Sequence, residues 1–236
     1  MLLKSLREEV LEANLEIVRR GLVLYTFGNA SGVDREQGLV VIKPSGVDYD
    51  SLRPEDMVVT NLEGEIVDGK LRPSSDLDTH TLLYREFPSI GAIVHTHSEF
   101  ATSFAQAGLP IPAFGTTHAD YFHGPVPITE PLTDEAIADR YVHETGLAIV
   151  ARFRDSSDGR QLDPLATPAC LVAGHAPFAW GKTPNDAAHN AVVLESVARM
   201  AYRTLVLNAE AGGVSQTLLN RHYFRKHGKD ATYGQK

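Results

Sequence analysis

The sequence has a single cysteine, Cys170, among its 236 residues, and it has no long hydrophobic run. One cysteine cannot form an intramolecular disulfide, which is typical of a protein from a reducing compartment. Because Cys170 lies in an apolar stretch, we expect its thiol to pack in the core rather than to act as a nucleophile. No segment approaches the roughly 18 apolar residues of a membrane helix, and the charged residues 4–12 do not resemble a signal peptide. We therefore expect a soluble, cytoplasmic protein without a membrane partner.

An excess of positive charge is also lacking. The chain has 22 Lys and Arg residues against 30 Asp and Glu residues, which gives a net charge of -8. Proteins that bind nucleic acid usually carry a basic face, so we expect no nucleic-acid partner, although a small anion would need only a local site. Hydrophobic residues make up 43% of the chain, an ordinary globular composition. From the length we expect one domain over residues 1–236.

Hydrophobic periodicity predicts alternating helices and strands along the chain. The expected helices are 3–20, 79–87, 98–108, 133–141, 183–208 and 215–227. The expected strands are 22–27, 38–42, 57–60, 65–67, 90–94 and 170–173, with a short extended piece at 125–128. Residues 28–32, 43–46, 116–121 and 154–163 are expected to form loops, because they are polar or rich in small residues.

Two histidines, His95 and His97, follow the apolar run 90–94. Residues two apart on an extended chain face the same side, so both imidazoles would enter one space at the end of the strand. Such a pair suits a divalent transition metal. Taken alone, the pattern is also typical of ordinary surface or hydrogen-bonded histidines. A second predicted strand, 170–173, is followed closely by His175, and Asp76 precedes a predicted helix, so a Zn-like ligand set is available.

Two loops have groups that suit a phosphate. Residues 43–46 bring together the cation of Lys43, the hydroxyl of Ser45 and the flexible backbone of Gly46. Residues 73–76 place two hydroxyls and a carboxylate before a predicted helix, where they are either N-caps or part of an anion site.

Seven motifs together resemble the L-ribulose-5-phosphate 4-epimerase family of the class II aldolase/epimerase superfamily. They are Gly28-Asn29, Lys43 to Tyr49, Pro73 to Asp76, Ile93 to His97, Gly115 to Tyr121, His175 to Gly181 and His222 to Gly228. The resemblance spans nearly the whole chain. It implies a three-layer α/β/α domain around a central mixed, largely antiparallel sheet. It also implies a homotetramer with active sites between neighbouring subunits.

The resemblance also implies the roles of the site residues. A Zn²⁺ ion, which Mn²⁺ or Co²⁺ could replace, would be held by His95, His97 and His175, with Asp76 at or beside the metal. The phosphorylated pentulose substrate would be bound by Gly28, Asn29, Lys43, Ser45, Gly46, Ser74, Ser75 and Thr116, with His222 and Arg225 contributed by the adjacent subunit. Asp120 and Tyr233 would be the acid/base pair, with pKa values shifted toward neutrality. From their places in the chain, Asp120, in the loop after the metal strand, can belong to the subunit that holds the metal, and Tyr233, in the tail, could reach a neighbouring site.

The activity implied is the interconversion of L-ribulose 5-phosphate and D-xylulose 5-phosphate by cleavage of C3–C4, rotation of the aldehyde and re-addition. A class II sugar-phosphate aldolase of the L-fuculose-phosphate type is the first alternative, and Asp76, where such aldolases are expected to have Glu, favours the epimerase. A non-catalytic metal- or partner-binding member of the superfamily is the second alternative. Two departures from the family pattern are the sequence Ala173-Gly174-His175-Ala176 and the long polar segment 154–168.

Overall fold

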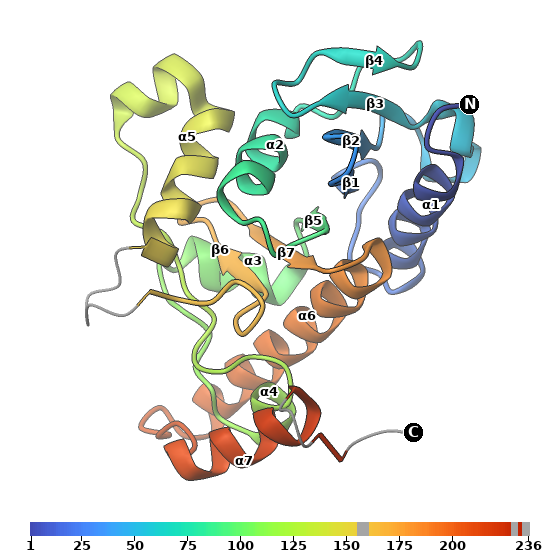
Figure 1. The fold of residues 1–236 in the computed structure, drawn as a ribbon. Helices are drawn as coiled ribbons and strands as arrows, with labels where there is room; N and C mark the ends of the chain where they lie inside the picture. The colour runs from blue at the N-terminus through green and yellow to red at the C-terminus, as the bar shows by residue number, and fades with distance from the viewer. Residues whose placement is uncertain (155–160, 228–230, 233–236) are drawn as a thin grey trace.

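A seven-stranded sheet forms the centre of the computed structural model, which describes residues 1–154, 161–227 and 231–232 (Figure 1). The strand order is β4-β3-β2-β1-β5-β7-β6, and every neighbouring pair is antiparallel. The strands are β1 (Gly28–Asp34), β2 (Leu39–Ile42), β3 (Val58–Asn61), β4 (Ile66–Asp68), β5 (Ala92–Thr96), β6 (Ala169–Leu171) and β7 (Pro177–Gly181). Among the described residues, parallel pairing is confined to one isolated bridge between Ile128 and Leu171. The expected, largely antiparallel sheet is confirmed.

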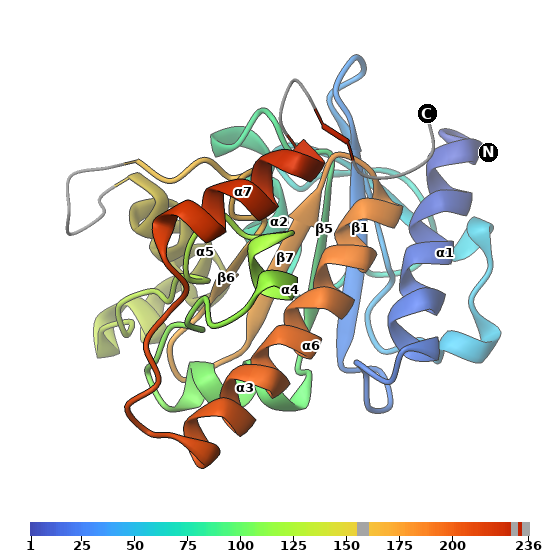
Figure 2. The ribbon, with the colours of Figure 1, turned by 90° about the horizontal axis from the view of Figure 1, so that it is seen from below.

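Helices cover both faces of this sheet, which gives the predicted three layers (Figures 1 and 2). One layer consists of α1 (Lys4–Arg19), α3 (Glu99–Gln106) and α6 (Pro184–Leu207). The other consists of α2 (Leu77–Glu86) and α5 (Asp134–Arg154), whose apolar side chains pack with Ile93 and Trp180 of the sheet. Two further helices, α4 (Thr116–Ala119) and α7 (Gln216–His227), pack on each other at one end of the molecule. Two 3-10 turns, η1 (Tyr49–Ser51) and η2 (Pro54–Asp56), lie between β2 and β3.

The first predicted strand is wrong, and the loop predicted after it is a central strand. Residues 22–27 are irregular; Leu22 is buried, but Leu24, Tyr25 and Phe27 are exposed, with Tyr25 87% accessible. The small residues 28–32 instead begin β1, between β2 and β5. A Cβ atom on Gly32 would lie 2.8 Å from Leu6 of α1, so the absence of a side chain lets the helix approach the strand. The apolar run misleads because most of its large side chains lie at the surface, whereas the packing of α1 and α2 against the sheet favours the small residues of β1.

Asn29 and Ser31, two residues apart on β1, point to the same face of the sheet. The hydroxyl of Ser31 lies 2.7 Å from both the Nδ1 atom of His80 and the hydroxyl of Tyr84, and both of these residues belong to α2. On the same face, the side chain of Asn29 is directed toward the beginning of α2. β1 therefore brings buried polar groups to α2, and it positions its first residues beside β5, where His95 pairs with Asn29.

Two further predictions are corrected. The helix expected at 133–141 continues to Arg154, with a non-helical residue at Arg140. Strand β7, which the sequence patterns did not predict, lies between β5 and β6. The polar segment 116–121 contains the short helix α4 rather than only a loop, and of the loop expected at 154–163, residues 155–160 lie outside the described residues.

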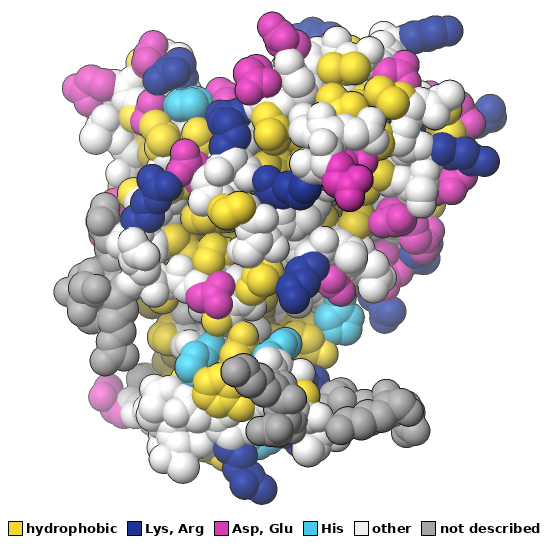
Figure 3. All heavy atoms as spheres, in the orientation of Figure 1, with side chains coloured by type: hydrophobic (Ala, Val, Ile, Leu, Met, Phe, Trp, Pro, Cys, Tyr) yellow, Lys and Arg dark blue, Asp and Glu magenta, His cyan; other side chains and the backbone are white. Residues whose placement is uncertain are grey.

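The surface has mixed charge. On the face drawn in Figure 3, Lys and Arg side chains are interspersed with Asp and Glu side chains. In the described part of the chain, no helix combines the length and the hydrophobicity needed to cross a membrane.

Candidate metal centre and active site

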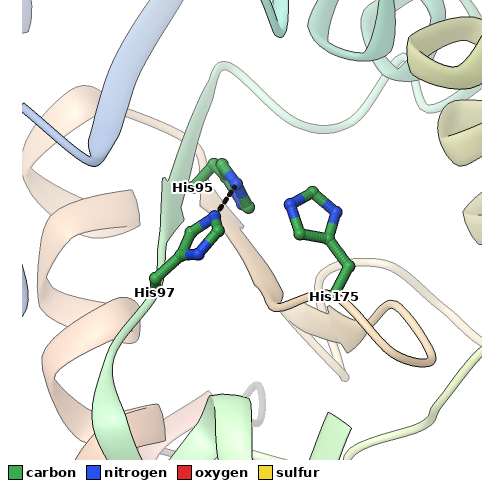
Figure 4. Close-up of side chains that lie close together, drawn as sticks. All are labelled: His95, His97 and His175. Carbon is green, nitrogen blue, oxygen red and sulfur yellow. Dashed lines mark hydrogen bonds between the residues drawn. The ribbon is translucent and has the colours of Figure 1, made fainter. Parts of the chain in front are cut away.

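Three histidines converge at one end of the central strands (Figure 4). His95 and His97 come from the end of β5, and His175 comes from the turn between β6 and β7. One ring nitrogen from each lies within 4.8 Å of the corresponding atoms of the other two. The Nε2 atoms of His95 and His97 are 3.2 Å apart. β7 produces this convergence, because it pairs with β5 and so brings the preceding turn beside the histidine pair.

The surroundings of the three rings fit metal binding. The Nδ1 atom of His95 lies 2.9 Å from the carbonyl oxygen of Pro177 and donates to it, which leaves the lone pair of Nε2 directed toward the other rings. The Nδ1 atom of His175 is buried, and none of the described residues forms a hydrogen bond with it. Burial lowers the pKa of all three imidazoles, that of His175 to about 4. All three are therefore neutral at neutral pH, the form that binds a transition metal.

A cavity of about 470 Å³ opens in front of the histidines. This volume suits a small organic ligand. All four residues of the predicted metal set line it, as do seven of the ten residues predicted to bind substrate: Gly28, Asn29, Lys43, Ser45, Gly46, Ser74 and Ser75. Thr26, Phe27, Pro44, Tyr141 and Val142 complete its lining.

The two predicted phosphate loops lie side by side in the structure. The amide of Ser45 donates to the carbonyl of Arg72, and the amide of Ser74 donates to the carbonyl of Lys43, each over 3.0 Å. Pro44 and Pro73 pair between these two hydrogen bonds. This short ladder places the Ser45–Gly46 turn beside the N-terminus of α2, where backbone amides and the helix dipole favour an anion.

Lys43 is expected to provide a cation for the phosphate, but its amine is engaged by its own loop. Its side chain is buried, and its Nζ atom donates to the carbonyls of Pro44 and Val47, at 3.2 and 2.9 Å. The same ammonium lies 4.6 Å from the centre of the Tyr49 ring. Burial lowers the pKa of Lys43 to about 8. In this arrangement the amine holds the shape of the loop that carries Ser45 and Gly46.

Asp76 lies at the cavity beside the three histidines but is not a member of their cluster. One of its carboxylate oxygens accepts a 2.6 Å hydrogen bond from the side-chain amide of Asn29. Burial alone would raise the pKa of Asp76, but the imidazoles of His95 and His80 and the Asn29 hydrogen bond together lower it. Asp76 therefore presents an ionised carboxylate at the cavity, and the hydrogen bond from Asn29 fixes its orientation.

The remaining predicted residues lie elsewhere. Asp120 follows α4, and its carboxylate accepts hydrogen bonds from His222 and Arg225 of α7, at 3.0 and 2.8 Å. Burial opposes ionisation, but these hydrogen bonds and the charge of Lys226 outweigh it and lower the pKa of Asp120. This direction is opposite to the expected shift toward neutrality. Neither this group nor Thr116 lines the cavity of its own chain, and Tyr233 lies outside the described residues.

Tyr141 is the cavity residue that the sequence patterns missed most clearly. Its ring centre lies 5.9 Å from that of His175. The sequence marks only the end of a predicted helix at this position, and neither a motif nor a chemical pairing singles it out. Only the tertiary structure identifies Tyr141, because α5 is interrupted at Arg140 and the next residue lines the cavity.

Comparisons with known proteins agree with this fold. The family model described as "Class II Aldolase and Adducin N-terminal domain" matches residues 8–202. A solved structure named L-fuculose 1-phosphate aldolase has a TM-score of 0.77 and 24% identity, covering 94% of this chain and 96% of that one. Two structures named YgbL, a putative aldolase/epimerase/decarboxylase, are each 25% identical. The one from Klebsiella pneumoniae has a TM-score of 0.70 and covers 94% and 99% of the two chains. The one from Escherichia coli has a TM-score of 0.72 and covers 92% and 97%.

Proposed function

The chain belongs to the class II aldolase and adducin N-terminal domain family, and from this membership we propose that it is a metal-dependent enzyme that breaks and re-forms a carbon–carbon bond in a phosphorylated sugar. The observation that carries this proposal is one cavity lined both by three neutral imidazoles and by two loops suited to a phosphate. A sugar phosphate has oxygen atoms for a metal held by the imidazoles, and it has a phosphate for the two loops. We propose that the protein acts in the cytoplasm.

The specific reaction we propose is the interconversion of L-ribulose 5-phosphate and D-xylulose 5-phosphate. In the first sugar the carbonyl is at C2 and the carbon to be inverted is C4, so the carbonyl does not acidify the proton on C4. Cleaving C3–C4 instead gives an enediolate conjugated with C2 and a second fragment, glycolaldehyde phosphate. If the aldehyde turns before the bond re-forms, C4 is inverted. The seven sequence motifs and Asp76 support this choice.

His95, His97 and His175 would hold the metal, which we propose to be Zn²⁺, with Mn²⁺ or Co²⁺ as a substitute. A divalent cation in this place supplies a Lewis acid for a substrate oxygen that gains negative charge. Asp76 would sit at or beside this ion, with its carboxylate kept in place by Asn29.

The loops would retain the phosphate-bearing fragment while the aldehyde turns. Ser45 and Gly46 would approach it from one loop and Ser74 and Ser75 from the other, with hydroxyl and amide donors. Lys43 would contribute mainly by keeping its loop in shape, because its amine is already bonded to that loop. Gly28 also lines the cavity; a Cβ atom there would lie 3.0 Å from the carbonyl oxygen of His95 in a backbone conformation with φ of 128°, so a side chain would be strained.

The proton carriers would come from a neighbouring subunit of a homotetramer. Asp120 is bound to His222 and Arg225 within its own chain, and none of the three lines that chain's cavity. These residues, with Thr116, would enter the cavity of the next subunit as one group. We propose Asp120 and Tyr233 as the acid/base pair, both contributed by that neighbour. This arrangement differs from the one expected from the sequence, in which Asp120 acted in its own subunit.

The second candidate is an aldolase that releases both fragments. It is favoured by the structure named L-fuculose 1-phosphate aldolase, which shares the fold over nearly the whole chain. One experiment separates the candidates. The zinc-loaded protein is incubated with L-ribulose 5-phosphate, and D-xylulose 5-phosphate and free aldehyde are measured in parallel. The epimerase forms the first without accumulating the second, the aldolase accumulates aldehyde, and a non-catalytic family member forms neither.

A further inference from the structure

We propose that Tyr141 contacts the substrate directly and that its phenol donates a hydrogen bond to a substrate oxygen at the histidine end of the cavity. This inference rests on the proposed function, and it assigns a specificity role to a residue of α5 that the sequence motifs do not include. Tyr141 lines the cavity together with Val142.

The first step is the path of the backbone. α5 is interrupted at Arg140, whose φ of -137° and ψ of 60° are not helical. The interruption lets the chain turn so that Tyr141 enters the cavity while residues 145–153 of the same helix pack on α2.

The second step is that α2 holds this turn in place. The hydroxyl of Thr79 donates to the carbonyl of Val142 over 2.5 Å, and His143 lies 3.1 Å from the carboxylate of Asp78. Both α2 residues follow Asp76 by no more than three positions. The helix that presents the Asp76 carboxylate therefore also fixes the backbone that presents Tyr141.

The third step is the chemistry around the phenol. Tyr141 is in ring contact with His175, and it lines the same cavity as Asp76. A neutral phenol keeps its proton and can donate it in a hydrogen bond.

The fourth step is what the phenol would recognise. A substrate whose phosphate rests on the Ser45 and Ser75 loops must extend toward the histidines to reach the metal. Tyr141 is on the histidine side, so its partner would be a hydroxyl, carbonyl or carboxylate oxygen of the part that the metal holds. Val142 beside it offers only an apolar wall. The phenol would therefore select ligands that carry an oxygen acceptor at that end.

Two probes and two variants test this role. The probes are inorganic phosphate, which we expect to occupy the loops, and 2-phosphoglycolate, which carries a phosphate and a carboxylate on adjacent carbons. The variants are Tyr141→Phe, which removes only the phenolic oxygen, and Tyr202→Phe as a matched control, because Tyr202 is an exposed residue of α6 that does not line the cavity. Dissociation constants are measured by calorimetry on zinc-loaded proteins, and zinc content is measured separately.

We expect Tyr141→Phe to weaken 2-phosphoglycolate binding by roughly tenfold to a hundredfold, the effect of one lost hydrogen bond to a charged acceptor. Phosphate affinity and zinc content should stay within about twofold of the wild type, since Tyr141 is neither a loop residue nor a ligand. Tyr202→Phe should change neither affinity.

Three results would overturn the inference. Unchanged 2-phosphoglycolate affinity would show that the phenol makes no contact. An equal loss for both probes would show that it supports the loops instead. A loss of zinc would show that it supports His175. If the wild-type protein binds neither probe, the proposed sugar-phosphate function falls together with this inference. If the wild type binds both and Tyr141→Phe matches it, only the role of Tyr141 falls.

Discussion

The side-chain amide of Asn29 lies 2.6 Å from a carboxylate oxygen of Asp76, although 47 positions separate them in the sequence. Asn29 is nearly the first residue of β1, and it pairs with His95 on β5. Asp76 immediately precedes α2. The hydrogen bond therefore links β1, which pairs with β5, to the beginning of α2, and it gives the carboxylate a fixed direction beside the three histidines.

The first prediction concerns this contact. Asn29→Ala should lower turnover by roughly tenfold to a hundredfold, because the carboxylate of Asp76 loses the donor that orients it. Zinc content should stay unchanged, since the three imidazoles are intact. Steady-state kinetics and metal analysis check both parts. Unchanged turnover would mean that Asp76 does not depend on Asn29 for its function.

The second prediction concerns the metal. His97→Asn should weaken zinc binding by at least about a hundredfold, because removing a direct ligand costs more than removing a residue that only orients one. Chelation should abolish the activity of the wild type, and added Zn²⁺ should restore it. His189→Asn is the matched control, because His189 is an exposed residue of α6 outside the cavity. Full activity of a metal-free preparation would contradict the mechanism.

The third prediction concerns the phosphate loops. Ser75→Asp should raise the Michaelis constant for L-ribulose 5-phosphate by about tenfold or more, because it places a negative charge where the phosphate is expected. Ser89→Asp adds the same charge at an exposed position outside the cavity and should leave the constant unchanged. If both variants behave alike, the phosphate does not bind at Ser75.

Most of the fold could be predicted from local patterns. The helix 183–208 and the hairpin around Gly64 appear where expected, because capping signals, apolar periodicity and turn residues all lie close in sequence. β1 could not be predicted, because its small and polar residues have low strand propensity on their own. They suit a strand only because α1 packs against Gly32 and α2 supplies partners for Ser31.

The candidate site also contains residues that local patterns predict and residues that only the tertiary structure identifies. The histidine pair follows from the alternation of a strand, and the loop chemistry follows from residue types. The contribution of Tyr141 could not be predicted, because it depends on a break in α5 and on hydrogen bonds from a helix some 60 residues earlier in the chain. The location of Asp120 could not be predicted either, because contacts with α7, 102 to 105 positions later, decide where it lies.

The fourth prediction concerns acid stability. His118 is buried, its Nε2 atom donates to the carbonyl of Gly124, and burial lowers its pKa to about 4 from 6.5. Between these values the unfolded chain binds a proton that the folded chain does not, so stability falls as the pH decreases from about 6.5 to about 4. The loss for this group is on the order of 3 to 4 kcal/mol, at roughly 1.4 kcal/mol per pH unit.

The matched variant for this test is His118→Gln, whose amide can donate to the same carbonyl but does not titrate. Urea unfolding at several pH values should show a smaller loss of stability at acid pH in the variant than in the wild type. His80, whose pKa burial lowers to about 3, keeps its contribution in both proteins and cancels in the difference. Equal pH dependence in both would show that His118 titrates normally in the folded state.

The last prediction concerns the subunit that supplies Asp120. His97→Asn removes the metal from its own subunit, and Asp120→Asn removes the carboxylate. If Asp120 acts in the neighbouring cavity, mixed tetramers contain sites in which the metal comes from an Asp120→Asn subunit and the carboxylate from a His97→Asn subunit. Random assembly of equal amounts should restore about one quarter of the sites. Mass spectrometry of the mixed tetramers confirms that subunits have exchanged.

A second mixture distinguishes the two possible arrangements. When Asp120 and Tyr233 come from the same neighbour, each site receives both groups from one chain. Mixing Asp120→Asn with Tyr233→Phe then restores no activity, because every neighbour lacks one of the two groups. If Asp120 instead acts in its own subunit and Tyr233 acts from the neighbour, this second mixture recovers activity and the first does not. The first outcome is expected, because the bonds to His222 and Arg225 keep Asp120 outside its own chain's cavity.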